Sequence, residues 1–176
     1  MPKDIKLVPL EASDREQFIT DNQQAFLYGA TEEFGLRDDH FEENGQIISR
    51  ETIEKSIDAP NAETYRIMDG DKKVGGVVIE VDKETLRGDL QLLFVIPSEH
   101  SKGVGYATWC AIEKLHPEIE VWETATPYFE KRNIHFYVNR CGFKIVEFYN
   151  EHHICDEIPE EEQRLDEMFR FEKVMK

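Results

Sequence analysis

Residues 95–106 read Val-Ile-Pro-Ser-Glu-His-Ser-Lys-Gly-Val-Gly-Tyr, and this stretch says more about the fold than any other part of the chain. It overlaps a run from Asp89 to Ile96 that is almost continuously apolar from Leu92, as expected for a strand covered on both faces. From Gly103 to Leu115 the apolar residues recur at helical spacing. The sequence therefore predicts a buried strand that passes through a short loop into a helix.

The two glycines of this loop suit an anion-binding site. The N–H groups in the first turn of a helix have no partner inside the helix and point along the positive end of its dipole, so they can bind a phosphate. Gly103 and Gly105 let the backbone approach such an anion without a Cβ atom. Tight packing is the alternative use of both glycines. The pattern is neither a P-loop nor a dinucleotide-binding loop, because Gly-Lys-Ser/Thr and a third glycine are missing.

Hydrophobic patterning on either side of the loop predicts the remaining elements. Strands are expected at 5–10, 64–68, 74–81, 89–96, 119–124, 143–149 and 168–174. Helices are expected after residue 13, at 49–60, at 103–115 and at 133–141, and the segments 35–45 and 151–167 read as loops. This order indicates an α+β fold with a mixed, mostly antiparallel central sheet of about seven strands, flanked by about four helices.

The size and composition of the chain indicate one domain over residues 1–176. A hydrophobic fraction of 40% in 176 residues supplies a core for a single domain. No apolar run approaches the ~20 residues of a membrane-spanning helix, and the first residues lack the apolar stretch of a signal peptide. The three cysteines are widely spaced and form no disulfide framework. We therefore expect a cytoplasmic protein without a membrane partner.

The formal net charge of −16 argues against a nucleic-acid partner, since binding to phosphates needs a basic face. An acidic field attracts cationic substrates such as protonated amines, although acidity can also serve solubility alone. The acidic stretch from Asp156 to Glu162 is a candidate to flank such an acceptor site.

Two motifs resemble the GNAT superfamily of acetyltransferases. Residues 95–105 resemble its Arg/Gln-x-x-Gly-x-Gly/Ala loop after a strand that ends in Val-x-Pro, with His100 at the Arg/Gln position. Residues 133–143, Asn-Ile-His-Phe-Tyr-Val-Asn-Arg-Cys-Gly-Phe, resemble the later helix of the family, which carries Asn and Tyr and ends in Gly-Phe. The commonest family spacing would place the tyrosine at Val138, whereas this chain has Tyr137. One residue turns a side chain about 100° around a helix, so either a bulge restores the register or Tyr137 points elsewhere.

This resemblance implies a small, bacterial-type N-acetyltransferase that uses acetyl-CoA as cosubstrate and needs no metal. The amine of a small molecule or protein, expected to be cationic, would attack the thioester directly in a ternary complex. A homodimer is one expected assembly. The alternative is a catalytically silent module that binds or senses acyl-CoA. By resemblance, the expected CoA contacts are Phe94, Val95, His100, Ser101, Lys102, Gly103, Val104, Gly105, Tyr106, Asn133 and Arg140.

The reaction needs a neutral amine, yet alkyl amines have pKa values near 10, so a general base is expected. By resemblance to the histone-type members of the family, Asp89 matches the position of the base, and Glu80 and Glu123 on neighbouring strands are the other candidates. Tyr137 is expected to protonate the departing thiolate. A strand N–H around Phe94 to Val95 is expected to stabilise the oxyanion. The sequence His-His-x-Cys at 152–155 lacks the second pair that a zinc site needs.

Overall fold

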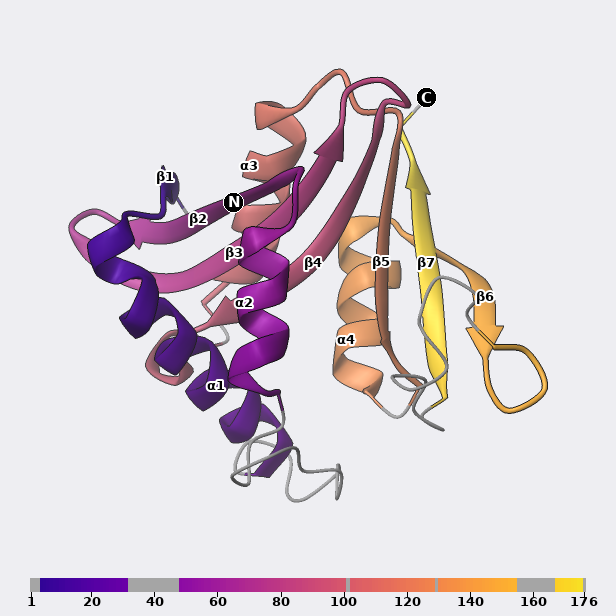
Figure 1. Cartoon of the computed structure of the whole chain (residues 1–176), viewed down its shortest axis with the longest axis horizontal. Coiled ribbons are helices and arrows are strands. Elements are labelled where there is room, and N and C mark those ends of the chain that lie inside the picture. Colours follow the sequence, from indigo (N-terminus) through magenta and orange to yellow (C-terminus); the bar gives the residue numbers. More distant parts are fainter. Residues whose placement is uncertain (1–3, 32–47, 101, 129, 155–166, 176) are drawn as a thin grey trace.

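The computed structural model describes residues 4–31, 48–100, 102–128, 130–154 and 167–175. Its elements follow the predicted succession of strands and helices (Figure 1). They are β1 (Lys6–Pro9), α1 (Arg15–Thr31), α2 (Arg50–Asp58), β2 (Ala62–Asp69), β3 (Lys72–Asp82), β4 (Arg87–Val95), α3 (Val104–Leu115), β5 (Val121–Pro127), α4 (Lys131–His135), β6 (Lys144–Tyr149) and β7 (Met168–Val174). Short helical segments are η1 (Ala12–Asp14), η3 (Pro97–Glu99) and the π-helix η4 (Phe136–Cys141).

The strands form one seven-stranded sheet in the order β1-β2-β3-β4-β5-β7-β6. Neighbouring strands are antiparallel except β4 and β5, which are parallel, so the predicted α+β fold with a mostly antiparallel sheet is confirmed. Helices α1 and α2 lie on one face of the sheet, and α3 and α4 lie on the other (Figure 1). Within the described residues, no helix combines the length and the apolar character that spanning a membrane requires.

A β-bulge lies in the middle of the strand that leads to the glycine loop. Val78 pairs with Leu92 but Ile79 pairs with Leu90, so Gln91 is an extra residue on β4. Leu90 therefore belongs to the core under α3, whereas Leu92 belongs to the core under α1 and α2. In a regular strand the two leucines would share a face. The bulge and the alternation after it let apolar residues of β4 contribute to both cores.

Aromatic side chains fill both cores. On the α1 side, the rings of Phe18 and Phe94 meet edge to face with centres 5.1 Å apart. Gly76 makes room for them, because a Cβ there would lie 2.3 Å from the Phe18 ring. On the α3 side, Trp109 and Trp122 meet in the same way at 5.4 Å. These contacts hold α1 against β4, which leads to the glycine loop, and α3 against β5.

Candidate active site

Strands β4 and β5 form a fork. They pair over only three positions, Arg87–Asp89 against Val121–Glu123. Beyond these positions the strands separate, and the open end of the fork points down in Figure 1. Thr124 stands at the closed end, where its Oγ1 donates a hydrogen bond of 3.0 Å to the carbonyl of Leu90. A side chain thus makes the last link between the strands.

The β4 side of the fork presents backbone groups to the opening. The Ile96 N–H donates to the Val74 carbonyl of β3 at 2.9 Å. Hydrogen-bonded residues alternate in an antiparallel ladder, so Phe94 also turns its N–H toward β3. Leu93 and Val95, in the opposite phase, turn their N–H and C=O groups away from β3 and toward the fork.

The alternation of backbone N–H groups along β4 corrects one sequence-based prediction. Phe94 was expected to contact the cofactor and, with Val95, to offer an N–H to the oxyanion. Its N–H instead faces β3, and its side chain, only 2% exposed, lies in the core under α1. Of the two, Val95 is the residue whose backbone faces the fork. The apolar run in the sequence could not reveal this phase, because the phase depends on pairing with β3.

The glycine loop begins α3 as predicted. Gly103 is the N-cap of the helix and has a φ of 80°, in the left-handed region that favours glycine. A Cβ there would meet nothing within 4 Å, so the backbone conformation is what requires glycine. The Ala107 N–H donates to the Gly103 carbonyl at 3.1 Å. The preceding first-turn N–H groups, those of residues 104–106, have no acceptor inside the helix, as the predicted anion-binding role requires. The Val104 side chain itself is buried in the core.

Two predicted motifs that are distant in sequence meet at the start of α3. A Cβ at Gly105 would lie 3.3 Å from the ring of Phe136 in η4, so this glycine allows the two helices to pack closely. The guanidinium carbon of Arg140 lies 5.1 Å from the centre of the Tyr106 ring. A positive side chain is therefore held beside the first turn of α3, where it adds to the attraction for an anion.

His100, at the Arg/Gln position of the family loop, is turned inward. Its Nε2 donates a hydrogen bond of 2.7 Å to the Val95 carbonyl, and its ring meets Tyr28 of α1 edge to face at 5.5 Å. The side chain thus ties the loop to the end of β4 and to α1. Its contacts are those of a residue that shapes the loop.

The other basic residue of the loop lies beside a buried acid. Lys102 Nζ lies 3.4 Å from Oε2 of Glu99, whose side chain is only 3% exposed and which also binds Lys72. Hydrogen bonding from Lys72 holds the pKa of Glu99 below its usual value. Ser101, the remaining predicted loop contact, lies outside the described residues, as do residues 156–162 of the predicted acidic stretch.

A π-helix resolves the unusual spacing of Tyr137. The N–H groups of Gly142 and Phe143 both donate to the Tyr137 carbonyl, the latter at 2.9 Å. A π turn contains one residue more than an α turn, which matches the extra residue between Tyr137 and the Gly-Phe pair. Of the two outcomes expected for this helix, the bulge is the one present.

The Tyr137 side chain reaches the closed end of the fork. Its ring lies against Phe143 and Phe171, with centres 5.8 and 5.6 Å away, and its hydroxyl is hydrogen-bonded to Thr124. Burial raises the pKa of Tyr137 to about 12, and the hydrogen bond with Thr124 acts in the opposite direction. Tyr137 is thus a neutral phenol at physiological pH, as a proton donor must be.

The three candidate bases lie in one row on the other side of the sheet. Glu80, Asp89, Glu123 and Glu172 are successive cross-strand partners on β3, β4, β5 and β7. Directly paired residues share a face of the sheet. Glu123 alternates with Trp122 and Thr124, which face α3 and α4, so the row lies on the α1 and α2 face. The carboxylates and the Tyr137 hydroxyl therefore approach the closed end of the fork from opposite faces.

The members of this row differ in their partners. Glu123 Oε1 accepts hydrogen bonds from Arg87 at 2.9 Å and from Arg170 at 2.5 Å, and Glu172 binds the same two arginines. Hydrogen bonding from Arg170 lowers the pKa of Glu172. Two guanidinium groups thus bind the Glu123 carboxylate, one from each neighbouring strand. Gln91 donates to Glu80 at 3.2 Å.

Asn133, the last predicted contact, lies on the β5 side of the fork. Its Nδ2 donates to Oγ1 of Thr126 at 3.2 Å, and its side chain is otherwise exposed. Predicted residues therefore line both strands of the fork, with the glycine loop beyond the end of β4.

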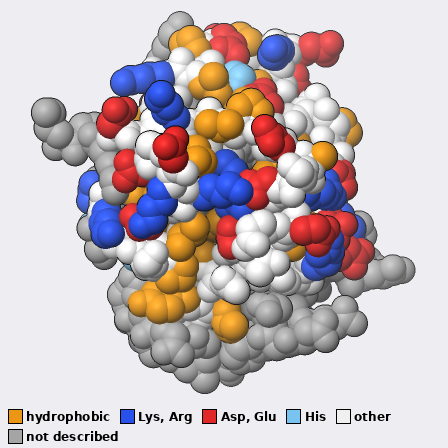
Figure 2. Space-filling model, turned by 90° about the vertical axis from the view of Figure 1, so that its left-hand side faces the viewer, with side chains coloured by type: hydrophobic (Ala, Val, Ile, Leu, Met, Phe, Trp, Pro, Cys, Tyr) orange, Lys and Arg blue, Asp and Glu red, His pale blue; other side chains and the backbone are white. Residues whose placement is uncertain are grey.

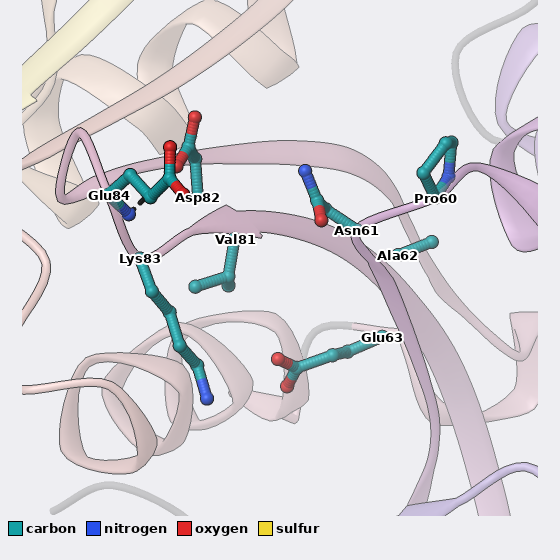
Figure 3. A pocket seen from close by; sticks show the side chains of 8 residues that line it. All are labelled: Pro60, Asn61, Ala62, Glu63, Val81, Asp82, Lys83 and Glu84. Atoms are coloured by element: carbon teal, nitrogen blue, oxygen red, sulfur yellow. Dashed lines mark hydrogen bonds between the residues drawn. The ribbon is translucent and has the colours of Figure 1, made fainter.

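A separate hollow of about 550 Å³ lies at the opposite end of β4 from the glycine loop, between the start of β2 and the end of β3. In Figure 3, Glu63 and Lys83 point to one side of it and Asp82 and Glu84 to the other. It does not include the fork. Figure 2 shows that acidic and basic side chains are interspersed on the face it displays, so the net negative charge does not form one continuous field there.

The comparisons with known proteins bear on the family and on the fold. No family model matches the chain. The chain is 44% identical over 171 residues to the uncharacterized protein YrkN of Bacillus subtilis strain 168, which covers 93% of this chain and 90% of YrkN.

Solved structures with the same fold include acetyltransferases. The ribosomal-protein-S18-alanine N-acetyltransferase of Escherichia coli has a TM-score of 0.68 at 12% identity, over 98% of this chain and 94% of that one. A Bacillus subtilis acetyltransferase in complex with CoA has a TM-score of 0.63 at 17% identity, over 98% of both chains. The spermidine N-acetyltransferase of Vibrio cholerae, in complex with CoA and spermine, has a TM-score of 0.65 at 14% identity, over 97% of this chain and 95% of that one. The chain therefore belongs to the same protein family as YrkN, and its fold is that of the GNAT superfamily.

Proposed function

We propose that this protein is an N-acetyltransferase that moves the acetyl group of acetyl-CoA to a primary amine by direct attack in a ternary complex. The observation that carries the proposal is the fork between β4 and β5. The helix start that would bind an anion lies beyond the open end of β4, and the hydroxyl of the partly buried Tyr137 lies at the closed end. The structural likeness to acetyltransferases supports this assignment through the fold.

The residues present fit acetyl-CoA. The first-turn N–H groups of α3 and the Arg140 guanidinium would hold the pyrophosphate. The backbone groups of Leu93 and the N–H of Val95 would pair with the pantetheine arm, because the Val95 carbonyl already accepts from His100. Leu90 to Val95 spans five residue steps, or about 17 Å of extended chain. An arm bound along β4 would thus have its thioester end toward Thr124 and Tyr137. The cosubstrate supplies the activated acetyl group.

The general base and the general acid would lie on opposite faces of the sheet. Deprotonating an alkyl amine of pKa near 10 at pH 7 costs about 4 kcal/mol, so a base on the side from which the amine approaches is needed. Asp89 lies in the carboxylate row on that side and would be the base, since its position matches that of the base in the histone-type members. Tyr137, on the other side, would protonate the departing thiolate. The oxyanion forms at the thioester carbon, so a backbone N–H of β4 near Leu90, at the closed end of the fork, would stabilise it in place of the distant Val95 N–H.

A cationic amine is the acceptor that the chain's charge favours. The formal net charge is −16, and four carboxylates form the row at the fork. The structurally similar Vibrio cholerae enzyme is a spermidine N-acetyltransferase, which is an example of a cationic acceptor on this fold. Arg87 and Arg170 neutralise part of the negative charge of the row. The attraction of the amine would therefore come from the net charge of the whole protein as well as from the row.

A thiol-release assay tests this function directly. Acetyl-CoA is incubated with polyamines, amino acids, aminoglycosides and N-terminal peptides, and free CoA is measured. Release that depends on one class of amine, with acetylated product seen by mass spectrometry, is expected. CoA binding by calorimetry without release for any amine would instead support the silent acyl-CoA-binding module.

A further inference from the structure

Thr124 connects two features that the proposed reaction needs. It is only 3% exposed and stands on β5, one residue beyond the last position where β5 pairs with β4. Its hydroxyl touches both the Leu90 carbonyl at the closed end of the fork and the hydroxyl of Tyr137. No motif in the sequence marks this residue, and its neighbours on the same face are Trp122 and Thr126.

The direction of these hydrogen bonds follows from the groups involved. The Leu90 carbonyl can only accept, so the Thr124 hydroxyl donates its one proton to it. The Thr124 oxygen still has a lone pair, and the Tyr137 hydroxyl therefore donates to Thr124. The hydrogen bond fixes the direction of the phenol O–H at the closed end of the fork. Packing against Phe143 and Phe171 fixes the position of the ring.

We propose that Thr124 is a positioning residue for Tyr137, whose hydroxyl first orients the phenol and then reverses its own hydrogen bond to stabilise the tyrosinate. This inference rests on the proposed function. In the step, the O–H bond of Tyr137 breaks and an S–H bond forms on the departing thiolate. The negative charge moves to the phenolate oxygen. The Thr124 proton then turns from the Leu90 carbonyl to that oxygen, and a proton from water restores the phenol.

The remaining neighbours of Tyr137 offer the phenolate little help. Cys141, on the same π-helix, is the titratable group that acts on Tyr137, and burial raises the pKa of its thiol to about 12, so it stays neutral. Phe143 and Phe171, which pack against the ring, do not titrate. Lys173 acts on Cys141 and is paired with Glu113 at 2.9 Å. Among these groups, the Thr124 hydroxyl is the one that contacts the phenol oxygen and can turn its proton toward it.

The test combines a titration with kinetics. Fluorotyrosine, which has a more acidic phenol, is incorporated into the full chain, and the fluorine signal of Tyr137 is assigned by its loss in Tyr137→Phe. Thr124→Val should raise the pKa of the Tyr137 phenol by about one unit or more and lower kcat about 10- to 100-fold at unchanged CoA affinity, because a hydrogen bond to a charged group is lost. Thr124→Ser keeps the hydroxyl and should restore both values.

Thr126→Val is the matched control for the titration, since Thr126 lies on the same strand and face, is equally buried, and bonds Asn133 instead. It should leave the Tyr137 signal unchanged. Thr124→Ala is the second variant if Thr124→Val does not fold. An unchanged Tyr137 pKa in a folded Thr124 variant, or a raised pKa with full kcat, would overturn the proposal. If the wild-type protein transfers no acetyl group to any amine, the proposed function fails, while the titration still reports on the bond itself.

Discussion

Gly103 allows the anion-binding role of the glycine loop to be separated from backbone strain. Replacing it with Gln or with Glu introduces the same left-handed strain, about 1–2 kcal/mol, because the position has a φ of 80°. Neither side chain meets a steric barrier at its Cβ, which faces open space. The two variants have the same length and differ by one charge. Any difference between them therefore reports the electrostatics of the start of α3.

The expected difference has opposite signs in two measurements. A carboxylate near a helix N-terminus stabilises the helix by about 0.3–1 kcal/mol, so without CoA Gly103→Glu should melt about 1–4 °C above Gly103→Gln. The same carboxylate repels a bound phosphate. At a separation of about 6 Å and an effective dielectric constant between about 80 and 20, each phosphate charge costs about 0.7–2.8 kcal/mol. CoA should thus bind Gly103→Glu about 3- to 100-fold more weakly than Gly103→Gln.

Calorimetric titration with CoA at low and high salt measures this effect. The gap between the two variants should narrow at 1 M salt, where the Debye length is about 3 Å. Gly70 provides the control, because it also has a positive φ, of 63°, and open space at its Cβ, but lies in the turn between β2 and β3. Gly70→Gln and Gly70→Glu should bind CoA equally well. Equal CoA affinity in the two folded Gly103 variants would refute the placement of the pyrophosphate.

Three further predictions concern catalysis, stability and the acceptor. Tyr137→Phe should lower kcat by ~10²–10⁴-fold at unchanged CoA affinity, and full turnover in this variant would make Tyr137 a packing residue. Burial raises the pKa of Asp14, but hydrogen bonds from Arg66 and Lys73 outweigh it, so the pKa lies below its usual value and Asp14 stabilises the fold above about pH 4. Asp14→Asn should therefore cost roughly 2–3 kcal/mol at pH 7, since Arg66 is buried, and urea unfolding should show the difference from wild type shrinking as the pH falls to about 3. The kcat/KM for the preferred amine should fall as ionic strength rises. A kcat/KM that does not depend on salt would mean that the negative charge of the chain serves solubility and does not attract the substrate.

The order of the elements could be predicted because strong local signals separate them. Pro60 follows α2, Pro97 follows β4, and Gly142 ends η4 with a φ of 87°. Each of these residues limits the backbone by its own covalent geometry, whatever its tertiary partners. The prediction for β5 stopped at Thr124, whereas the strand runs to Pro127, because its last residues pair with β7, far along the chain.

The site was predictable where backbone geometry defines it, and less so where it depends on pairing. The glycine loop follows from residues 103 and 105 alone. The extra residue between Tyr137 and Gly142 was a usable signal for a π turn. The inward hydrogen bond of His100 and the contacts of Thr124 had no such signal, because they depend on where β4 leaves β5. That separation follows from the assembled sheet and cannot be read from either strand alone.

The strand order also constrains how the chain can fold during synthesis. β7 lies between β5 and β6 although it is the last strand in chain order. Strands β1 to β4 can pair as they emerge from the ribosome, but β5 and β6 have to wait for residues 168–174 before either has an antiparallel neighbour. Phe171, which packs against Tyr137, arrives with the same strand. A nascent chain stopped just before β7 would therefore expose two unpaired strand edges, which makes it a ready substrate for chaperones and proteases.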